Sequence, residues 1–183
     1  EFMDYVGMPL RDGLSFVHNA LVGIGVREKV KIGASGKITS AFDMARTLAL
    51  GADWCNAARG FMFAVGCIQA QSCHTGECPT GVATQDPLRQ RAIVVPDKAE
   101  RVASFHRNTL HALAELVAAA GLSHPAELRP HHFLRRASSD KVISLAEQYE
   151  QLASGQLAAD PASSPRFAEA WAHSSADSFA RAG

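Results

Sequence analysis

The decisive stretch of this chain reads Cys67-Ile-Gln-Ala-Gln-Ser-Cys73-His-Thr-Gly-Glu-Cys78-Pro-Thr-Gly-Val-Ala-Thr-Gln85. It contains all the cysteines except Cys55, at the spacing Cys67-x5-Cys73-x4-Cys78. Thiolates are soft ligands, so three of them in one short loop favour an iron–sulfur cluster or zinc. Pro79 directly after the last cysteine prevents a helix from continuing smoothly through the loop.

Other interpretations of the cysteines stay open at this point. They are compatible with small buried hydrophobic side chains, or with disulfides, although three is an odd number and no secretory context is visible. Zinc in a structural site takes four protein ligands, and His74 is the nearest candidate for the fourth. Because Cys73 and His74 are neighbours, their side chains diverge, and a cuboidal cluster with one corner missing fits three cysteines better.

Composition excludes several classes of protein. The chain has 183 residues, of which 47% are apolar and 20% charged, as expected for a globular domain. Lys and Arg number 18, as do Asp and Glu, so no basic field indicates nucleic acid as a partner. The sequence has no signal peptide and no apolar run long enough for a membrane segment, and we expect a cytoplasmic protein.

Two consecutive βα units precede the cysteines. We predict a strand at Lys29–Ala34, a glycine turn and a helix from Ser40 to Gly51, then a strand at Ala52–Ala58, a turn at Arg59-Gly60 and a helix at Phe61–Gln71 that includes Cys67. Short loops of this kind imply parallel strands, with both turns at the carboxyl ends. Helix N-termini there favour an anion, so the turns around Gly36 and Gly60 predict a phosphate site. Gly36-Lys37 does not follow the Walker pattern, because Ile38 stands where Ser or Thr is required.

Helical signals flank this region. We predict a helix from Asp12 to Ile24, a long helix capped by Asp97 and Glu100 and ending at Gly121, and a last helix at Asp140–Leu152. From Ser154 onward Ala, Ser, Pro and Asp dominate, which predicts poor order. The expected division is therefore 1–95 for the βα units and cysteine loop, 96–153 for closing helices, and 154–183 for a disordered tail.

Several of these residues resemble a known family. Gly51-Ala52-Asp53, Gly66-Cys67, Cys73-His74, Cys78 and the run Thr80–Asp86 are similar to the FMN-binding domain of glutamate synthase, as are Pro9, Gly13-Leu14, His18, Leu21 and Arg27. The resemblance covers about residues 5 to 125. It is greatest to the stand-alone bacterial glutamate-synthase-family FMN-binding proteins.

The resemblance implies an α/β fold, the C-terminal part of an FMN-binding (β/α)8 TIM barrel with an iron–sulfur loop and C-terminal helices. It implies FMN and a [3Fe-4S] cluster on Cys67, Cys73 and Cys78. The FMN phosphate would lie between two loops, at Ser35–Thr39 and Ala57–Gly60. The cofactor-binding candidates there are Ser35, Gly36, Lys37, Ala58, Arg59 and Gly60.

The implied activity is that of an oxidoreductase of the glutamate synthase type, acting on CH-NH2 donors. Electrons would pass through both cofactors to an imine formed from 2-oxoglutarate and ammonia, giving glutamate. The implied partners are a 2-oxo acid substrate and an electron donor, either a ferredoxin-like protein or a subunit that oxidises NAD(P)H. No catalytic residue is assigned within this chain.

The sequence also departs from the family pattern. Where the family has Gly-Gly-Leu-Lys-Thr-Gly, this chain has Ser35-Gly-Lys-Ile-Thr-Ser40, with the lysine shifted by one. Ala58 and Arg59 stand where Gly and Thr are common. A (β/α)8 barrel needs about 250 residues. We therefore expect this chain to be a fragment that lacks the substrate site and is inactive alone.

Two functions of other classes remain as alternatives. One is a non-catalytic module that binds zinc or a cluster through the three cysteines, perhaps with His74 or Cys55. The other is a flavin barrel related to inosine monophosphate dehydrogenase or the hydroxy-acid oxidases. That barrel would use one isolated, nucleophilic cysteine, which the clustering of three cysteines disfavours.

Overall fold

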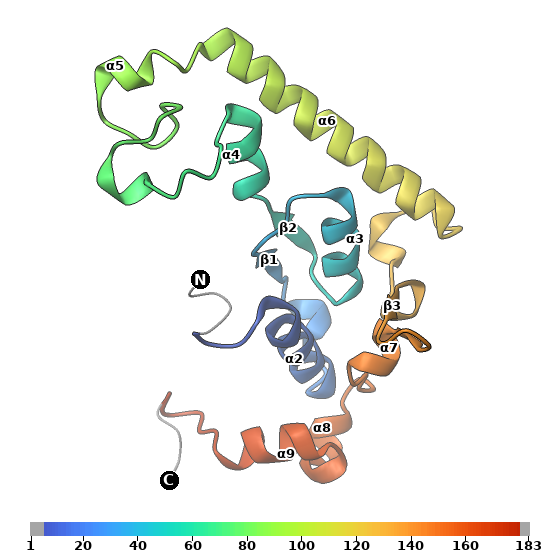
Figure 1. Ribbon diagram of the computed structural model, residues 1–183. Helices are drawn as coiled ribbons and strands as arrows, with labels where there is room; N and C mark the ends of the chain where they lie inside the picture. The colour runs from blue at the N-terminus through green and yellow to red at the C-terminus, as the bar shows by residue number, and fades with distance from the viewer. Residues whose placement is uncertain (1–5, 180–183) are drawn as a thin grey trace. The chain divides into compact units, whose positions relative to one another are not determined.

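The computed structural model describes residues 6–179, and its helices and short strands are mixed along the chain, as expected for the α/β class (Figure 1). The chain divides into two units. Unit 1 takes its described residues from Glu1–Gly33, Leu50–Asp53 and Arg129–Gly183, and unit 2 consists of Ala34–Ala49 and Trp54–Leu128. These units interleave along the sequence, whereas three consecutive segments were expected.

Unit 2 contains the two βα segments. Strands β1 (Gly33–Ser35) and β2 (Trp54–Asn56) pair in a two-stranded sheet, and they are followed by helices α3 (Ala41–Ala49) and α4 (Arg59–Val65). Both strands are shorter than predicted. Before β1 the chain forms a 3-10 turn, η1 (Arg27–Lys29), so the strand begins at Gly33 and not at Lys29.

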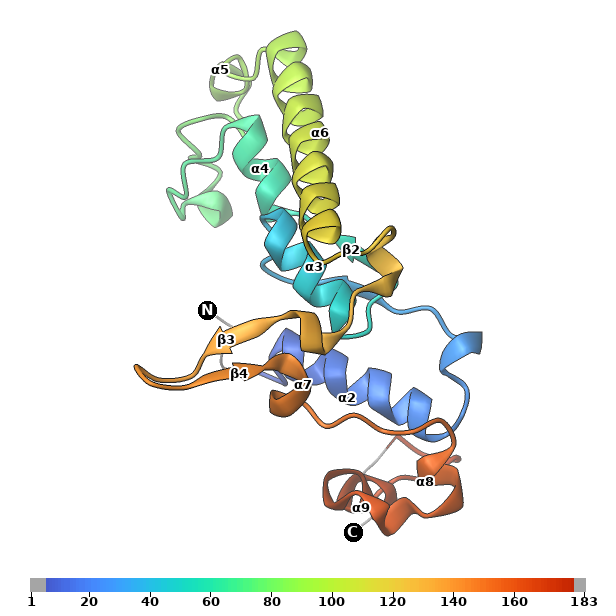
Figure 2. The ribbon, with the colours of Figure 1, turned by 90° about the vertical axis from the view of Figure 1, so that its right-hand side faces the viewer.

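The long helix α6 (Val95–Ala119) packs along α3 and α4, as both ribbon views show (Figures 1 and 2). Its length agrees with the predicted helix ending at Gly121. The predicted capping box is wrong, because the helix begins after Val94 without a side-chain cap, and Asp97 lies inside its first turn. The ring of Phe105 meets Phe61 of α4 edge-on at 5.2 Å between centroids, which joins the two helices.

In unit 1, helix α2 (Leu10–Gly23) confirms the predicted first helix, beginning two residues earlier after Pro9. Its buried Asn19 accepts a 3.0 Å hydrogen bond from the backbone N–H of Leu152, 133 residues away. At Gly23 the helix has no Cβ, and the space is taken by Leu157, whose side chain is 1% exposed. Helix α2 therefore packs directly against the C-terminal part of the chain.

The helix predicted at Asp140–Leu152 is wrong. Val142–Ser144 is strand β4, and it pairs antiparallel with β3 (Leu134–Arg136) in a hairpin that puts Leu134 opposite Ser144. A helix begins only after Ser144, where Ser144 and Glu147 form a capping box for the short α7 (Leu145–Gln148). Antiparallel pairing within this hairpin outweighed the local helical pattern.

The expected disorder after Ser154 is also wrong for the residues described. Helices α8 (Gln156–Ala159) and α9 (Pro165–Ala172) follow, and both Leu157 and Phe167 are buried. Phe167 stacks on Phe16 of α2 with 4.8 Å between ring centroids. A few well-placed apolar side chains anchor a segment whose average composition is that of a disordered one. The remaining short elements are α5 (Pro87–Gln90) and the 3-10 turns η2 (Cys73–Thr75), η3 (Pro125–Glu127), η4 (Pro130–His132) and η5 (Pro161–Ser163).

Arg27 joins three segments of unit 1. Its guanidinium donates to Nδ1 of His18 at 3.0 Å, to the carbonyl of Gly51 at 2.8 Å and to Oδ2 of Asp53 at 2.8 Å. The Asp53 carboxylate also accepts from the backbone N–H of Ile32 at 2.7 Å. Because Nδ1 of His18 is an acceptor here, the imidazole is neutral, and burial followed by the charge of Arg27 lowers its pKa. The hydrogen bonds of Arg27 thus connect His18 of α2 with Gly51 and Asp53.

None of the helices among the described residues combines the length and the apolar content required to cross a bilayer.

We predict that His18 makes the fold less stable as the pH falls below its ordinary pKa of 6.5. The folded pKa is depressed, so the unfolded chain binds the proton first. The stabilisation is complete above pH 6.5 and decreases as the pH falls toward the lower, folded pKa. Between pH 7.5 and 5.5, thermal unfolding of the wild type should lose more stability than that of His18→Gln, which cannot titrate. Equal slopes for the wild type and His18→Gln would contradict the prediction.

Candidate functional site

The cysteine loop begins where helix α4 ends. Gly66 closes the helix with a φ of 122°, so Cys67 lies just after the helix and not on it, contrary to the prediction. Between Cys67 and Cys73, the non-glycine residues Gln69 and Gln71 adopt left-handed φ values of 59° and 57°. Such residues cost about 1–2 kcal/mol each, and they concentrate at functional sites. The backbone here bends repeatedly instead of continuing as a helix.

Hydrogen bonds hold the loop in a folded-back form. The Thr84 hydroxyl donates to the carbonyl of Gly76, and Gln90 Nε2 donates to the carbonyl of Thr84 at 3.0 Å. A guanidinium nitrogen of Arg89 donates to the carbonyl of Glu77 at 3.2 Å. Residues on both sides of Cys78 are thereby tied to the short helix α5 that follows.

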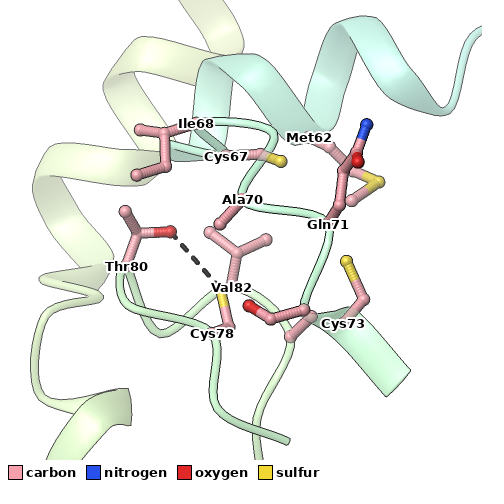
Figure 3. A pocket seen from close by; sticks show the side chains of 11 residues that line it. Met62, Cys67, Ile68, Ala70, Gln71, Cys73, Cys78, Thr80 and Val82 are labelled. Carbon is pink, nitrogen blue, oxygen red and sulfur yellow. Dashed lines mark hydrogen bonds between the residues drawn. The ribbon is translucent and has the colours of Figure 1, made fainter. Parts of the chain in front are cut away.

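The three loop cysteines line one small pocket, shown in Figure 3. Cys78 is buried, Cys67 half-buried and Cys73 exposed, and all are free thiols. The other lining side chains are mostly apolar or neutral, namely Met62, Ile68, Ala70, Gln71, Ser72, Thr80, Val82 and Ala83. The tertiary structure thus gathers the predicted metal-ligating residues around a single site, and the disulfide interpretation has no support in it.

The environment of Cys78 favours its thiolate. The Thr80 hydroxyl lies 3.5 Å from Sγ, and together with the backbone N–H groups of Ala83, Thr80 and Val82 it lowers the pKa of the Cys78 thiol to about 7. Cys67 Sγ accepts a contact of the same length, from the N–H of Gln69 at 3.5 Å. The sequence reasoning did not single out Thr80, although its place two residues after a ligand cysteine was a usable signal.

The donor set distinguishes between kinds of metal centre. Within the described part of the chain, no three His, Cys, Asp or Glu side chains are grouped to hold one metal ion. His74 is absent from the pocket lining, and Cys55 lines a different pocket. An iron–sulfur cluster takes its thiolates at separate irons, so its ligands surround a site and need not converge on a point. The thiol-lined apolar pocket fits a cluster held by Cys67, Cys73 and Cys78 better than it fits zinc.

The two loops predicted to hold phosphate come together in unit 2. Ser35 ends β1, Gly36 and Lys37 turn the chain with φ values of 148° and 50°, and Ala58–Gly60 begin α4. A Cβ on Gly60 would lie 3.5 Å from Cα of Thr39 and 2.9 Å from Cζ of Phe105. Glycine at position 60 therefore leaves room for the Phe105 ring beside the point where the two loops meet. Lys37 and Arg59 contribute exposed positive charges, which suit a phosphate.

The start of helix α3 already carries an anion of its own. Asp43 Oδ2 accepts hydrogen bonds from the Ser40 hydroxyl at 2.9 Å, the Thr39 hydroxyl at 3.2 Å and the Thr39 N–H at 3.3 Å. Burial alone would raise the pKa of Asp43, but these hydrogen bonds and the charge of Arg46 outweigh it and the pKa is lowered. A phosphate would therefore bind through Gly36, Lys37 and the start of α4, and not at the N-terminus of α3.

A second pocket lies between α3, β2, α4 and α6. Its lining combines apolar side chains with a few polar ones, namely Ile38, Thr39, Ser40, Met44, Cys55, Ala57, Phe61, Phe105, His106, Thr109 and Leu110. Burial raises the pKa of the Cys55 thiol to about 11. Cys55 is thus a neutral thiol at physiological pH, which is unsuited to a nucleophile. This disfavours the flavin barrel with one reactive cysteine.

Gly81 and Gly76 provide a matched test of the loop structure. Both have left-handed φ values, of 77° and 75°, but a Cβ at Gly81 would collide with the carbonyl oxygen of Arg89, whereas nothing lies near one at Gly76. Alanine costs about 1–2 kcal/mol at each through backbone strain. We expect Gly81→Ala to raise hydrogen–deuterium exchange across residues 76–90 far more than Gly76→Ala does. Equal exchange in the two variants would show that the contact between Gly81 and Arg89 does not hold the loop.

This chain is similar in sequence to known proteins. Residues 1–123 match the model for the conserved region in glutamate synthase. The chain is 41% identical over 154 residues to the glutamate synthase large subunit-like protein YerD of Bacillus subtilis, covering 84% of this chain and 29% of that protein. It is 35% identical over 128 residues to the archaeal glutamate synthase [NADPH] of Methanocaldococcus jannaschii, covering 70% and 25%. Over 93 residues it is 40% identical to the chloroplastic ferredoxin-dependent glutamate synthase of Oryza sativa subsp. japonica, covering 50% and 6%.

This chain spans less than a third of the length of each of these relatives. The family model covers about two thirds of the chain and includes both βα segments and the whole cysteine loop. The chain belongs to the glutamate synthase family.

Proposed function

We propose that this protein is an oxidoreductase of the glutamate synthase type, in which the described residues hold the iron–sulfur cluster and the phosphate end of FMN. The observation that carries the proposal is the single pocket lined by Cys67, Cys73 and Cys78. Family membership supports it, because the relatives are glutamate synthases or similar to them. The reaction would convert an imine of 2-oxoglutarate and ammonia into glutamate.

We infer that the chain forms the last two βα units of a (β/α)8 barrel, with the iron–sulfur loop and closing helices after them. The paired strands β1 and β2, each followed by a helix, support this inference. A barrel of about 250 residues needs further strands, which would come from outside these 183 residues. The substrate site and the catalytic residues would lie there too, so the chain alone is expected to be inactive.

Each group of residues has a defined task in this proposal. When bound, FMN would supply hydride transfer and the cluster single-electron transfer. Lys37 and Arg59 would neutralise the FMN phosphate, and Gly60 would keep the two loops close together. The cysteine thiolates would hold the irons, the low pKa of Cys78 favouring the deprotonated form that metal binding requires. Met62 and Val82, in the pocket lining, would limit contact with water.

The names of two relatives suggest the class of electron donor. Two of the relatives carry NADPH or ferredoxin in their names. We therefore infer either a ferredoxin-like protein or a subunit that oxidises NAD(P)H as the partner of this protein, and a cytoplasmic location. The alternative function is a non-catalytic module binding zinc or a cluster, and its zinc form makes a different prediction about the metal present.

The first prediction concerns that metal. Intact protein purified without oxygen should contain iron and acid-labile sulfide and give the low-temperature EPR signal of an oxidised three-iron cluster. Cys67→Ser, Cys73→Ser and Cys78→Ser should each reduce or abolish the signal, whereas Cys55→Ser, in the other pocket, should keep it. Stoichiometric zinc without iron would overturn the redox proposal and favour the structural module.

The second prediction concerns FMN. Replacing Arg59 or Lys37 with Ala removes a cation from the loops, and we expect FMN affinity to fall about tenfold or more, since hydrogen bonds to charged groups contribute about 1.5–3 kcal/mol. Quenching of flavin fluorescence on binding would measure the change in the intact protein. Arg107→Ala is the matched control, because Arg107 is an exposed cation of α6 paired with Glu100. FMN affinity that is unchanged in both loop variants would remove the phosphate from this site.

A further inference from the structure

We propose that Thr80 is a positioning residue that donates a hydrogen bond to the Cys78 sulfur and thereby raises the reduction potential of the cluster held in this pocket. The inference rests on the proposed function, because it requires a cluster on Cys67, Cys73 and Cys78. Thr80 Oγ1 lies 3.5 Å from Cys78 Sγ, the contact drawn as a dashed line in Figure 3. This distance is within the range of hydrogen bonds to sulfur.

The direction of this hydrogen bond follows from the chemistry of a metal-bound thiolate. A hydroxyl can donate or accept, but a cysteine sulfur bound to iron carries no proton. Thr80 must then be the donor. Cys78 is 7% exposed and Thr80 is half-buried, so water competes little for either group. A hydrogen bond in such surroundings is electrostatically stronger than one in water.

The hydroxyl of Thr80 differs from the other threonine hydroxyls of the loop. Thr75 Oγ1 donates to the carbonyl of Ser72 at 2.8 Å, and Thr84 Oγ1 donates to the carbonyl of Gly76. Both of those bonds shape the backbone. The Thr80 hydroxyl faces the Cys78 sulfur instead, so it can affect the electronic properties of a cluster bound to that sulfur.

The three sulfurs are also unequally surrounded. Besides the Thr80 hydroxyl, Cys78 faces the backbone N–H groups of Thr80, Val82 and Ala83. Cys67 has the N–H of Gln69 at 3.5 Å, and Cys73 is exposed. The hydrogen-bond donors are therefore concentrated around Cys78, the buried cysteine of the three. Among these donors, Thr80 contributes a side-chain hydroxyl, and the others are backbone N–H groups.

The effect on the potential has a definite sign. One-electron reduction adds negative charge, which spreads over the irons, the sulfides and the ligand sulfurs. A donor beside a ligand sulfur stabilises the more negative, reduced form more than the oxidised form. Removing the donor should make the cluster harder to reduce, without changing its ligands.

The experiment is a redox titration of the intact, anaerobically purified protein, followed by EPR of the oxidised cluster. Thr80→Val has the same shape but no hydroxyl, and we expect it to keep the iron content. Its reduction potential should fall by about 59 mV, which for a one-electron couple lowers the reduced-to-oxidised ratio at a fixed potential about tenfold. Thr80→Ser should restore the wild-type potential. Thr75→Val, which removes a hydroxyl that bonds only backbone, should leave the potential unchanged.

Each outcome decides the matter. A wild-type potential in Thr80→Val with a full cluster would overturn the inference and leave the proposed function intact. An equal shift in Thr75→Val would assign the effect to loop structure and overturn it too. A wild-type protein without iron would overturn the proposed function itself. If Thr80→Val fails to assemble the cluster, Thr80→Ser decides: assembly with the wild-type potential there supports the hydroxyl at the sulfur, and failure to assemble there too assigns Thr80 to loop packing and overturns the inference.

Discussion

The cysteine site depends on a change of backbone direction at Gly66. Its φ of 122° ends helix α4, where the apolar pattern and the lack of an earlier breaker favoured continuation to Gln71. Had the helix continued to Gln71, Cys67 would lie on the helix and not at the start of the loop. Two left-handed glutamines and the left-handed Gly76 and Gly81 complete the reversal. As a result, sulfurs up to eleven positions apart in sequence share one small, largely apolar pocket.

The position of this loop depends on the packing of helix α4, which precedes it, against helix α6. Helix α6 lies along α3 and α4, with Phe105 edge-on to Phe61, and the same Phe105 fills the space beside Gly60. A single aromatic side chain therefore supports both the cysteine loop, through α4, and the junction of the two predicted phosphate loops. This contact between two half-buried aromatic rings connects the two candidate cofactor sites within unit 2.

The departures from the family pattern acquire a physical meaning in the structure. Asp43 uses the hydroxyls of Thr39 and Ser40 to cap α3, so a carboxylate stands where a phosphate was expected to meet a helix N-terminus. Arg59, in place of a small residue, begins α4 as an exposed cation. Arg59 thus adds a positive charge beside the loops that the sequence predicts to hold phosphate.

Local signals were sufficient for part of this architecture. Helices α2, α3 and α6 follow from apolar periodicity and terminal glycines, and the family follows from the clustered cysteines and the residues around them, as the match over residues 1–123 confirms. The hairpin at Leu134–Ser144, the anchoring of Leu157 and Phe167, and the separation of Cys55 from the other thiols did not follow.

The sequence by itself determined which chemical groups are available and which helices form, because those properties depend on residue type and on neighbours within a few positions. Only the tertiary structure decided that Thr80 faces a sulfur, that the three loop thiols surround one pocket, and that residues after Ser154 pack on α2. The packing of the residues after Ser154 depends on contacts between residues far apart along the chain. The thiol pocket and the Thr80 contact depend on backbone turns at particular residues, which the pattern of residue types does not specify.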